Sequence, residues 1–184
     1  MLVPIKAFAE AKVRLAPALD ASERADLARR LAAGVIAAAA PLPVAVVCED
    51  DDVAAFAMAH GATVIRAPAV GLNRAVAAGV EALTAAGHDE VVVAHADLPR
   101  PEGLADLAGG DGRTVTLVPD RHDDGTNVLV VPTGCGFEFR YGAGSFAAHR
   151  SESERCGLAV RVVRAGGLAW DVDVPADLEG LPCD

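Results

Sequence analysis

Short, almost uninterrupted apolar runs alternate along this chain with segments of helical pattern, and this alternation restricts the fold more than any other feature. The clearest runs are MLVPI at 1–5, PVAVVC at 43–48 and EVVVA at 90–94. A strand that is apolar at every position has both faces buried, which is typical of a parallel sheet covered by helices on each side. The sequence therefore predicts an α/β fold of three layers, α/β/α, with a mostly parallel, Rossmann-like sheet.

The other elements follow from the same pattern and from residues that start and stop helices. Asp20 and Glu23, three residues apart, predict a capping box for a helix that runs to about residue 40. Asp50 or Asp51 is expected to cap a second helix that ends near residue 60. Further helices are predicted at 71–86, 101–108 and 144–156, further strands at 62–65, 114–118, 127–131 and 158–163, and a loop with a last helical turn at 171–181.

Length and charge limit the size of the protein and its partners. A chain of 184 residues predicts a single domain over 1–184, with 52% hydrophobic residues to fill its core. The net charge of −10 argues against a nucleic-acid partner, which requires clustered Lys and Arg. The uncharged stretch at 31–48 contains Pro41 and Pro43, so we interpret it as a helix end, a turn and a buried strand rather than a membrane span.

The cysteines and the N-terminus bear on the compartment. Cys48, Cys135, Cys156 and Cys183 are widely spaced and form no C-x-x-C pair, which disfavours a disulfide framework or a zinc site. No charged segment precedes an apolar run at the start of the sequence, so no secretory signal is predicted. The expected location is cytoplasmic, without membrane contact.

Positive charge is concentrated in the loop after the first predicted strand, VPIKAFAEAKVRLAP at 3–17. Lys6, Lys12 and Arg14 lie there, with Glu10 the only acidic residue before Asp20. Such a loop can neutralise the phosphates of a nucleotide, although it has no glycine and is neither a Walker loop nor G-x-G-x-x-G. A solvated basic loop is the alternative interpretation.

Aspartates stand where a metal ion can bind. Asp97 follows a buried strand in VVVAHADLP, and a carboxylate at the carboxyl end of a central strand can hold Mg²⁺ against a triphosphate. Capping of the next helix is the alternative role. In WDVDVPADL at 170–178, Asp171 and Asp173 alternate, so one of them is expected to face the ligand edge of the sheet. Asp177 is expected to be a solvated helix residue.

The segment PDRHDDGTN at 119–127 lies between two apolar strands. Asp124-Gly125 is a hairpin-turn signal, and a plain turn is one interpretation. The segment is richer in polar groups than a turn requires. Thr126 and Asn127 present a hydroxyl and an amide where the next strand begins, which suits an anion.

The segment FRYGAGSF at 139–146 comes just before a predicted helix. Gly142, Gly144 and Ser145 are placed to bring backbone N–H groups to an anion at the helix N-terminus, and Arg140 adds a positive charge. A plain glycine-rich helix start is the alternative.

Together these five segments resemble the phosphoenolpyruvate / 2-phospho-L-lactate guanylyltransferases of coenzyme F(420) biosynthesis, which are related to the molybdenum-cofactor guanylyltransferases. The resemblance extends from VPIK at residue 3 to VDVPADL at 172–178, and its most specific pieces are PDRHDDGTN and FRYGAGSF in that order. It implies transfer of GMP from GTP to phosphoenolpyruvate or 2-phospho-L-lactate, with release of pyrophosphate. Two features depart from the family: His95, where smaller residues are common, and the loop at 132–137.

The resemblance also implies the site residues. It places the nucleotide phosphates on Lys6, Lys12 and Arg14, and Asn73 beside the nucleoside. It implies Mg²⁺ at Asp97 and Asp173, with Asp171 as the fallback ligand. Lys12 joins these two aspartates as a catalytic residue. The acceptor-binding positions fall on Thr126, Gly142 and Ser145.

Two other functions stay open on sequence alone. One is a nucleotidyltransferase for another acceptor, such as molybdopterin or a sugar phosphate, against which stands the lack of a glycine-rich first loop. The other is a non-catalytic nucleotide-binding module, against which stand the intact Asp97 and Asp173. Cys135 and Cys156 are interpreted as packing residues. His95 and His122 are as readily surface or supporting groups as catalytic ones, and the oligomeric state is left open.

Overall fold

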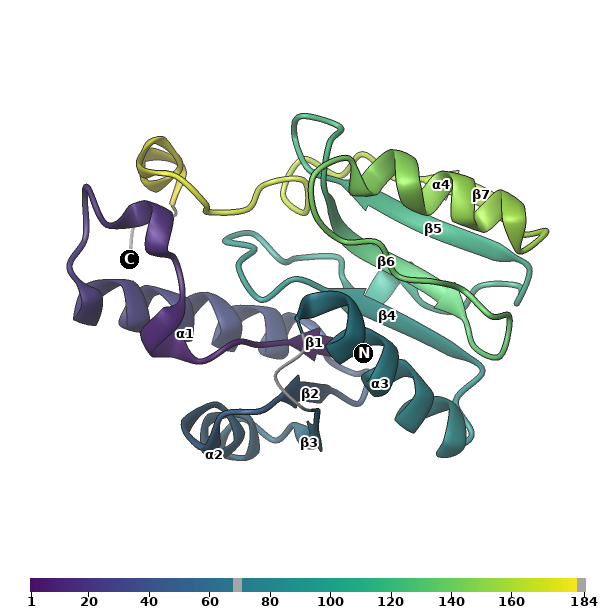
Figure 1. Ribbon diagram of the computed structural model, residues 1–184, viewed down its shortest axis with the longest axis horizontal. Coiled ribbons are helices and arrows are strands. Elements are labelled where there is room, and N and C mark those ends of the chain that lie inside the picture. Colours follow the sequence, from purple (N-terminus) through teal and green to yellow (C-terminus); the bar gives the residue numbers. More distant parts are fainter. Residues whose placement is uncertain (68–70, 182–184) are drawn as a thin grey trace.

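The structure, a computed structural model, describes residues 1–67 and 71–181. Seven strands form one sheet in the order β3-β2-β1-β4-β6-β5-β7 (Figure 1). Strand β6 runs antiparallel to β4 and β5, and the other neighbouring strands are parallel, so the predicted mostly parallel sheet is confirmed. The strands are β1 (Leu2–Pro4), β2 (Ala45–Cys48), β3 (Thr63–Arg66), β4 (Glu90–Ala94), β5 (Thr114–Pro119), β6 (Thr126–Pro132) and β7 (Ala159–Val162).

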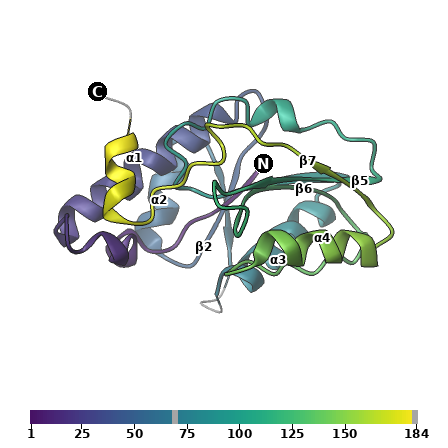
Figure 2. The same ribbon diagram turned by 90° about the horizontal axis from the view of Figure 1, so that it is seen from above.

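Helices cover both faces of the sheet, which gives the predicted three layers (Figure 2). Helices α1 (Ala21–Ala38) and α2 (Asp51–Ala59) pack on one face with Val3, Val46 and Val92. Helices α3 (Leu72–Ala85) and α4 (Ser145–Arg155) pack on the other with Leu2, Val47 and Val93. Adjacent strand residues thus enter opposite cores, as the strand geometry requires.

Local signals account for where the helices begin. The predicted capping box is present, since Glu23 N–H donates to Asp20 at 2.9 Å and Asp20 N–H donates to Glu23 at 2.7 Å. Of the two candidate caps for α2, Asp50 is the one that accepts from Val53 N–H, at 3.0 Å. Among residues 1–67 and 71–181, no helix combines the length and hydropathy needed to cross a membrane.

The predicted helix at 101–108 is wrong. That segment holds only a short 3-10 turn, η3 (Ala105–Leu107). Gly103 adopts the left-handed conformation, with φ at +84°, and such a residue interrupts a right-handed helix. The described residues contain three further 3-10 turns: η1 (Phe8–Glu10), η2 (Val13–Leu15) and η4 (Pro175–Gly180).

The topology gathers four distant segments at one edge of the sheet. Because β6 is antiparallel, its amino end lies beside the carboxyl end of β4, where Ala94 pairs with Val128. The backbone N–H of His95 continues this pairing by donating to Asn127 O at 3.0 Å. The C-terminal segment packs on α1 through Val172 and Leu178, which brings 171–173 beside the N-terminal loop.

The described cysteines are free thiols. Cys48 is buried, and Cys135 and Cys156 are partly exposed. Cys183 lies outside the described residues.

Candidate active site

A cleft of about 390 Å³ lies at the carboxyl ends of β1 and β4. Its walls come from the N-terminal loop, from the residues directly after β4 and from the C-terminal segment. The structure therefore brings together side chains that the sequence placed in three separate motifs. They are Lys6, Lys12, Arg14, His95, Asp97 and Asp173.

Lys12 and Asp97 form the centre of this cleft. Lys12 Nζ donates to Asp97 Oδ2 at 2.5 Å and to the carbonyl of Val172 at 2.6 Å, and only 9% of its side chain is exposed. Burial raises the pKa of Asp97, but the charges of Lys12 and His95 and the hydrogen bond from Lys12 outweigh it, so the pKa lies below its ordinary value. Asp97 is therefore a carboxylate at neutral pH.

Two further carboxyl groups approach this centre. Val172 N–H donates to Asp97 O at 3.3 Å, which brings the backbone of 171–173 beside Asp97. Burial and the negative charge of Asp97 raise the pKa of Asp171. Asp173 accepts instead from Arg14, at 2.5 Å, at the more exposed rim. Within the described ranges, no three His, Cys, Asp or Glu side chains form a ready metal-binding cluster.

Asp177 holds the segment that carries these carboxyl groups, and the prediction that it is solvated is wrong. The residue is 2% exposed. Its carboxylate accepts from the backbone N–H groups of Asp173 and Val174 at 2.7 and 2.8 Å. Arg121 from the β5–β6 turn supplies the compensating charge at 2.5 Å, and its guanidinium lies 4.5 Å from the centre of the Trp170 ring. The prediction failed because this partner is 56 residues away in the sequence.

The predicted acceptor residues Thr126 and Ser145 lie together, with their hydroxyl oxygens 3.4 Å apart. Both are almost fully buried. His149, which is fully buried on α4, places Nδ1 3.0 Å from Thr126 Oγ1. Sequence reasoning missed His149, because nothing in the pattern of α4 shows that it meets β6.

The predicted anion site at the start of α4 is largely capped from within the protein. Gly144 N–H donates to Asp124 Oδ1 and Ser145 N–H to Gly142 O, each at 3.1 Å. Phe146 N–H donates to the carbonyl of Asp124 at 3.0 Å. Within the described residues Gly142 N–H makes no hydrogen bond, so it is the predicted amide that remains for a ligand.

Asn73 joins α3 to the 139–146 segment. Its side-chain oxygen accepts from Tyr141 N–H at 2.6 Å, and its amide nitrogen donates to Tyr141 O at 3.1 Å. One amide hydrogen of Asn73 remains for another partner.

Two of the predicted cations are exposed and pair with nearby acids. Lys6 pairs with Glu10, and Arg140 pairs with Glu138.

A second cavity, of about 490 Å³, adjoins the cleft at the carboxyl ends of β1 and β2. The two cavities share four lining residues, Pro4, Ile5, Lys6 and Leu72. Cys48, Glu49 and Gly71 also line the second cavity. Gly71 and Leu72 directly precede Asn73, which the resemblance placed beside the nucleoside, whereas the sequence did not indicate the part of the lining that comes from β2.

The sequence matches a family of nucleotide-transferring enzymes along nearly its whole length. The profile of the family described as "Guanylyl transferase CofC like" matches residues 1–182. Phosphoenolpyruvate guanylyltransferase from Sphaerobacter thermophilus is 37% identical over 98% of this chain and 90% of the relative. A 3-phospho-D-glycerate guanylyltransferase from Phenylobacterium zucineum is 34% identical over 91% of this chain and 82% of the relative.

Solved structures share the fold. A protein from Desulfovibrio desulfuricans G20 assigned to the nucleotide-diphospho-sugar transferases superimposes with a TM-score of 0.75 at 19% identity, over 96% of this chain and 83% of that one. CMP:2-keto-3-deoxy-manno-octonic acid synthetase in complex with CTP gives a TM-score of 0.61 at 14% identity, over 97% and 94%. These structures confirm the predicted nucleotidyltransferase fold. The family match over nearly the full sequence shows that this chain belongs to the CofC-like guanylyl transferases and is a nucleotidyltransferase.

Proposed function

We propose that this protein transfers the guanylyl group of GTP to the phosphate of phosphoenolpyruvate and releases pyrophosphate, as a step in coenzyme F(420) biosynthesis. The supporting observation is that its cleft combines an ionised Asp97, a buried Lys12 and two exposed cations in a chain 37% identical to a phosphoenolpyruvate guanylyltransferase. 2-Phospho-L-lactate, which differs from phosphoenolpyruvate by little more than a double bond, is the alternative acceptor.

We assign the nucleotide to the two adjoining cavities. Lys12 has used two of its three N–H bonds on Asp97 and Val172, so one remains for a phosphate oxygen. Lys6 and Arg14 are 64% and 74% exposed and can turn from Glu10 and Asp173 toward phosphates, because exposed ion pairs are weak. The apolar second cavity then takes the base, and Asn73 lies at the start of α3 beside it.

The carboxylates fit Mg²⁺. Asp97 Oδ1 is buried and has no hydrogen-bond partner, and Asp171 lies near enough to be affected by its charge. We propose Asp97 and Asp171 as a pair of oxygen ligands, joined by Asp173 when Arg14 turns to the nucleotide. Bound there, Mg²⁺ would neutralise negative charge on the triphosphate and the leaving pyrophosphate.

The protein's own groups bring the reactants together. A phosphate oxygen of the acceptor attacks the α-phosphorus of GTP, and the bond to the β-phosphate oxygen breaks. Such a reaction requires alignment and charge neutralisation rather than a covalent intermediate. Lys12 holds the N-terminal loop against the end of β4, while Gly142 N–H and one hydroxyl of the Thr126–Ser145 pair offer neutral donors to the acceptor.

A second acceptor follows from one specific relative. The Phenylobacterium zucineum protein, 34% identical to this chain, is named for 3-phospho-D-glycerate. That acid also carries a phosphate and a carboxylate, so the same donors suit it. We place it behind phosphoenolpyruvate because the relatives with 37 and 35% identity over 98% of this chain are named for phosphoenolpyruvate.

The test is pyrophosphate release from GTP with each of the three acids. Phosphoenolpyruvate should give the highest kcat/KM, and release should require both acceptor and Mg²⁺. ATP at equal concentration should compete poorly with GTP. Pyrophosphate release with 3-phospho-D-glycerate alone would show that this acid, and not phosphoenolpyruvate, is the acceptor. No release with any of the three acids would contradict the proposed function.

A further inference from the structure

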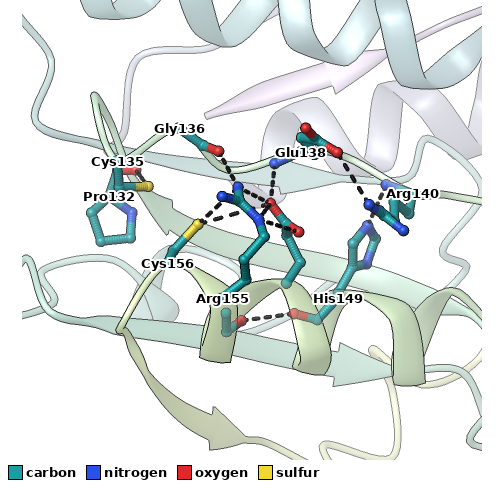
Figure 3. Close-up of polar contacts among 10 residues, drawn as sticks. Pro132, Cys135, Gly136, Glu138, Arg140, His149, Arg155 and Cys156 are labelled. Carbon is teal, nitrogen blue, oxygen red and sulfur yellow. Dashed lines mark hydrogen bonds and ion pairs between the residues drawn. The ribbon is translucent and has the colours of Figure 1, made fainter.

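His149 lies between two partners that together determine where its proton resides. On one side the backbone N–H of Arg140 donates to Nε2 at 3.0 Å (Figure 3). On the other side Nδ1 lies 3.0 Å from Thr126 Oγ1. A backbone N–H can only donate, so Nε2 must carry a lone pair. The neutral imidazole therefore carries its proton on Nδ1 and donates it to the Thr126 hydroxyl.

The neutral state itself is favoured by the surroundings of His149. The side chain is fully buried. Burial, helped by the charge of His95 and opposed by Glu152, lowers its pKa to about 4. The segment that presents Arg140 N–H is also fixed independently, since Glu138 N–H donates to Glu152 at 2.8 Å and Arg155 donates to Gly136 O at 2.6 Å. Both partners of His149 are thus held in place.

The hydroxyl hydrogens of Thr126 and Ser145 outnumber their acceptors in the described part of the protein by one. Thr126 and Ser145 have two hydroxyl hydrogens, and one of them is used in the bond between the two oxygens. The His149 proton occupies a lone pair of Thr126, so the ring cannot accept the second hydrogen. Within the described residues neither hydroxyl has another protein acceptor. One O–H therefore remains for a ligand, whichever of the two carries it.

The surroundings contain other unsatisfied polar atoms. Tyr141 OH and His95 Nε2 are buried and lack hydrogen-bond partners. The Tyr141 ring centre lies 4.8 Å from that of His149 and 5.3 Å from that of His95. His95 also lines the cleft, so this cluster adjoins the nucleotide site. Buried polar groups without partners are costly, which indicates a ligand that would satisfy them.

We propose that His149 is a positioning residue for the acceptor: by donating to Thr126 it keeps one hydroxyl of the Thr126–Ser145 pair as a donor to the acid's anionic group. The inference rests on the proposed function, because it takes the acceptor to bind beside these hydroxyls. If His149 Nδ1 accepted a hydrogen bond instead, both hydroxyl hydrogens would be used in bonds within the protein. The anionic group of the substrate acid would then face only oxygen lone pairs.

Two substitutions separate the two ends of the ring. In His149→Asn the amide nitrogen replaces Nδ1 as a donor to Thr126, and nothing accepts from Arg140 N–H. In His149→Gln the amide oxygen reaches the position of Nε2, and the donor to Thr126 is lost. We expect the Gln variant to raise the acceptor KM about tenfold, the scale of one hydrogen bond to a charged group, because without the proton from His149 the Thr126 hydroxyl is free to turn its hydrogen away from the acceptor. The Asn variant keeps that donor and should raise the KM about threefold at most. The KM for GTP should change little in either.

The Thr126→Val background provides the control. Val keeps the shape of Thr and removes the hydroxyl, so adding His149→Gln should raise the acceptor KM little further, because the two changes remove one interaction. Equal effects of His149→Gln with and without Thr126→Val would overturn the proposal. So would equal acceptor KM values for the Asn and Gln variants, which would assign His149 to packing.

The tautomer can also be measured without any substitution. Nitrogen-15 NMR of the histidine side chains in the whole protein should show His149 protonated on Nδ1 at neutral pH, with shifts when phosphoenolpyruvate is added to the protein with GTP and Mg²⁺ absent. An Nε2-protonated ring would refute the proposal directly. Failure of wild-type protein to use any acceptor would instead refute the proposed function, so the two failures are distinguishable.

Discussion

Lys12 Nζ lies 2.5 Å from Asp97 Oδ2, although the two residues are 85 positions apart in the sequence. The contact fixes the N-terminal loop against the carboxyl end of β4, and a second bond to Val172 O at 2.6 Å adds the C-terminal segment. One ammonium group thus joins three parts of the cleft. It also keeps Asp97 ionised, because a nearby positive charge favours the carboxylate.

Substitution of Asp97 should separate catalysis from stability. Asp97→Asn is expected to lower kcat about a hundredfold or more, the scale of losing one charge-stabilising group. It should also destabilise the fold by about 1–3 kcal/mol, because Lys12 is left buried without its counter-charge. Adding Lys12→Met should recover part of the stability and none of the activity. Steady-state kinetics and urea unfolding of the wild type and both variants check this, and wild-type kcat in Asp97→Asn would contradict it.

The two C-terminal carboxylates should differ in importance. Asp171→Asn removes the group that lies near Asp97, so we expect a loss of kcat of about a hundredfold and a raised requirement for Mg²⁺. Asp173→Asn removes a rim carboxylate bonded to Arg14, and its loss should be smaller. Magnesium titrations of the two variants compare them. A larger effect in Asp173→Asn would restore the order of ligands that the sequence suggested.

Asp177 should act through the backbone that it holds. Asp177→Ala removes the acceptor of two backbone N–H groups, those of Asp173 and Val174, and of the Arg121 guanidinium. The free energy of unfolding should therefore fall by about 1–3 kcal/mol. Turnover should fall as well, because this segment carries Asp171. Glu179→Ala, an exposed acid on the same 3-10 turn, is the matched control and should change neither quantity. Thermal and urea unfolding measure the stability of both variants, and equal losses of stability in the two would contradict this role of Asp177.

Glu152 should make the fold sensitive to acid. Hydrogen bonds from Arg155, together with one from Glu138 N–H, lower its pKa from the ordinary 4.5 to about 2. A carboxyl group whose folded-state pKa is depressed stabilises the fold fully above its unfolded pKa and loses that contribution as pH falls toward the folded value. The stability difference between wild type and Glu152→Gln should therefore shrink as pH falls from about 6 to about 3. Urea titrations at both pH values measure it, and a constant difference would exclude the linkage.

The sequence predicted what depends on local signals. Apolar runs gave the strands, and Asp20 with Glu23 gave the start of α1, because a capping box involves residues three positions apart. The helix expected at 101–108 failed because Gly103 adopts a positive φ that composition does not reveal. Asp177 was wrongly predicted to be solvated and His149 was missed, because their partners, Arg121 and Thr126, are 56 and 23 residues away. Only the folded topology shows those pairs.

Phosphorus NMR of the reaction products tests the central claim most directly. The protein is incubated with GTP, phosphoenolpyruvate and Mg²⁺, and the spectrum is followed with time. We predict two new, mutually coupled signals of equal area, one from the former α-phosphorus of GTP and one from the acceptor phosphate, appearing together with one equivalent of pyrophosphate. Formation of GMP and pyrophosphate without a new phosphorus–oxygen–phosphorus linkage, or no change in GTP, would contradict guanylyl transfer to this acceptor.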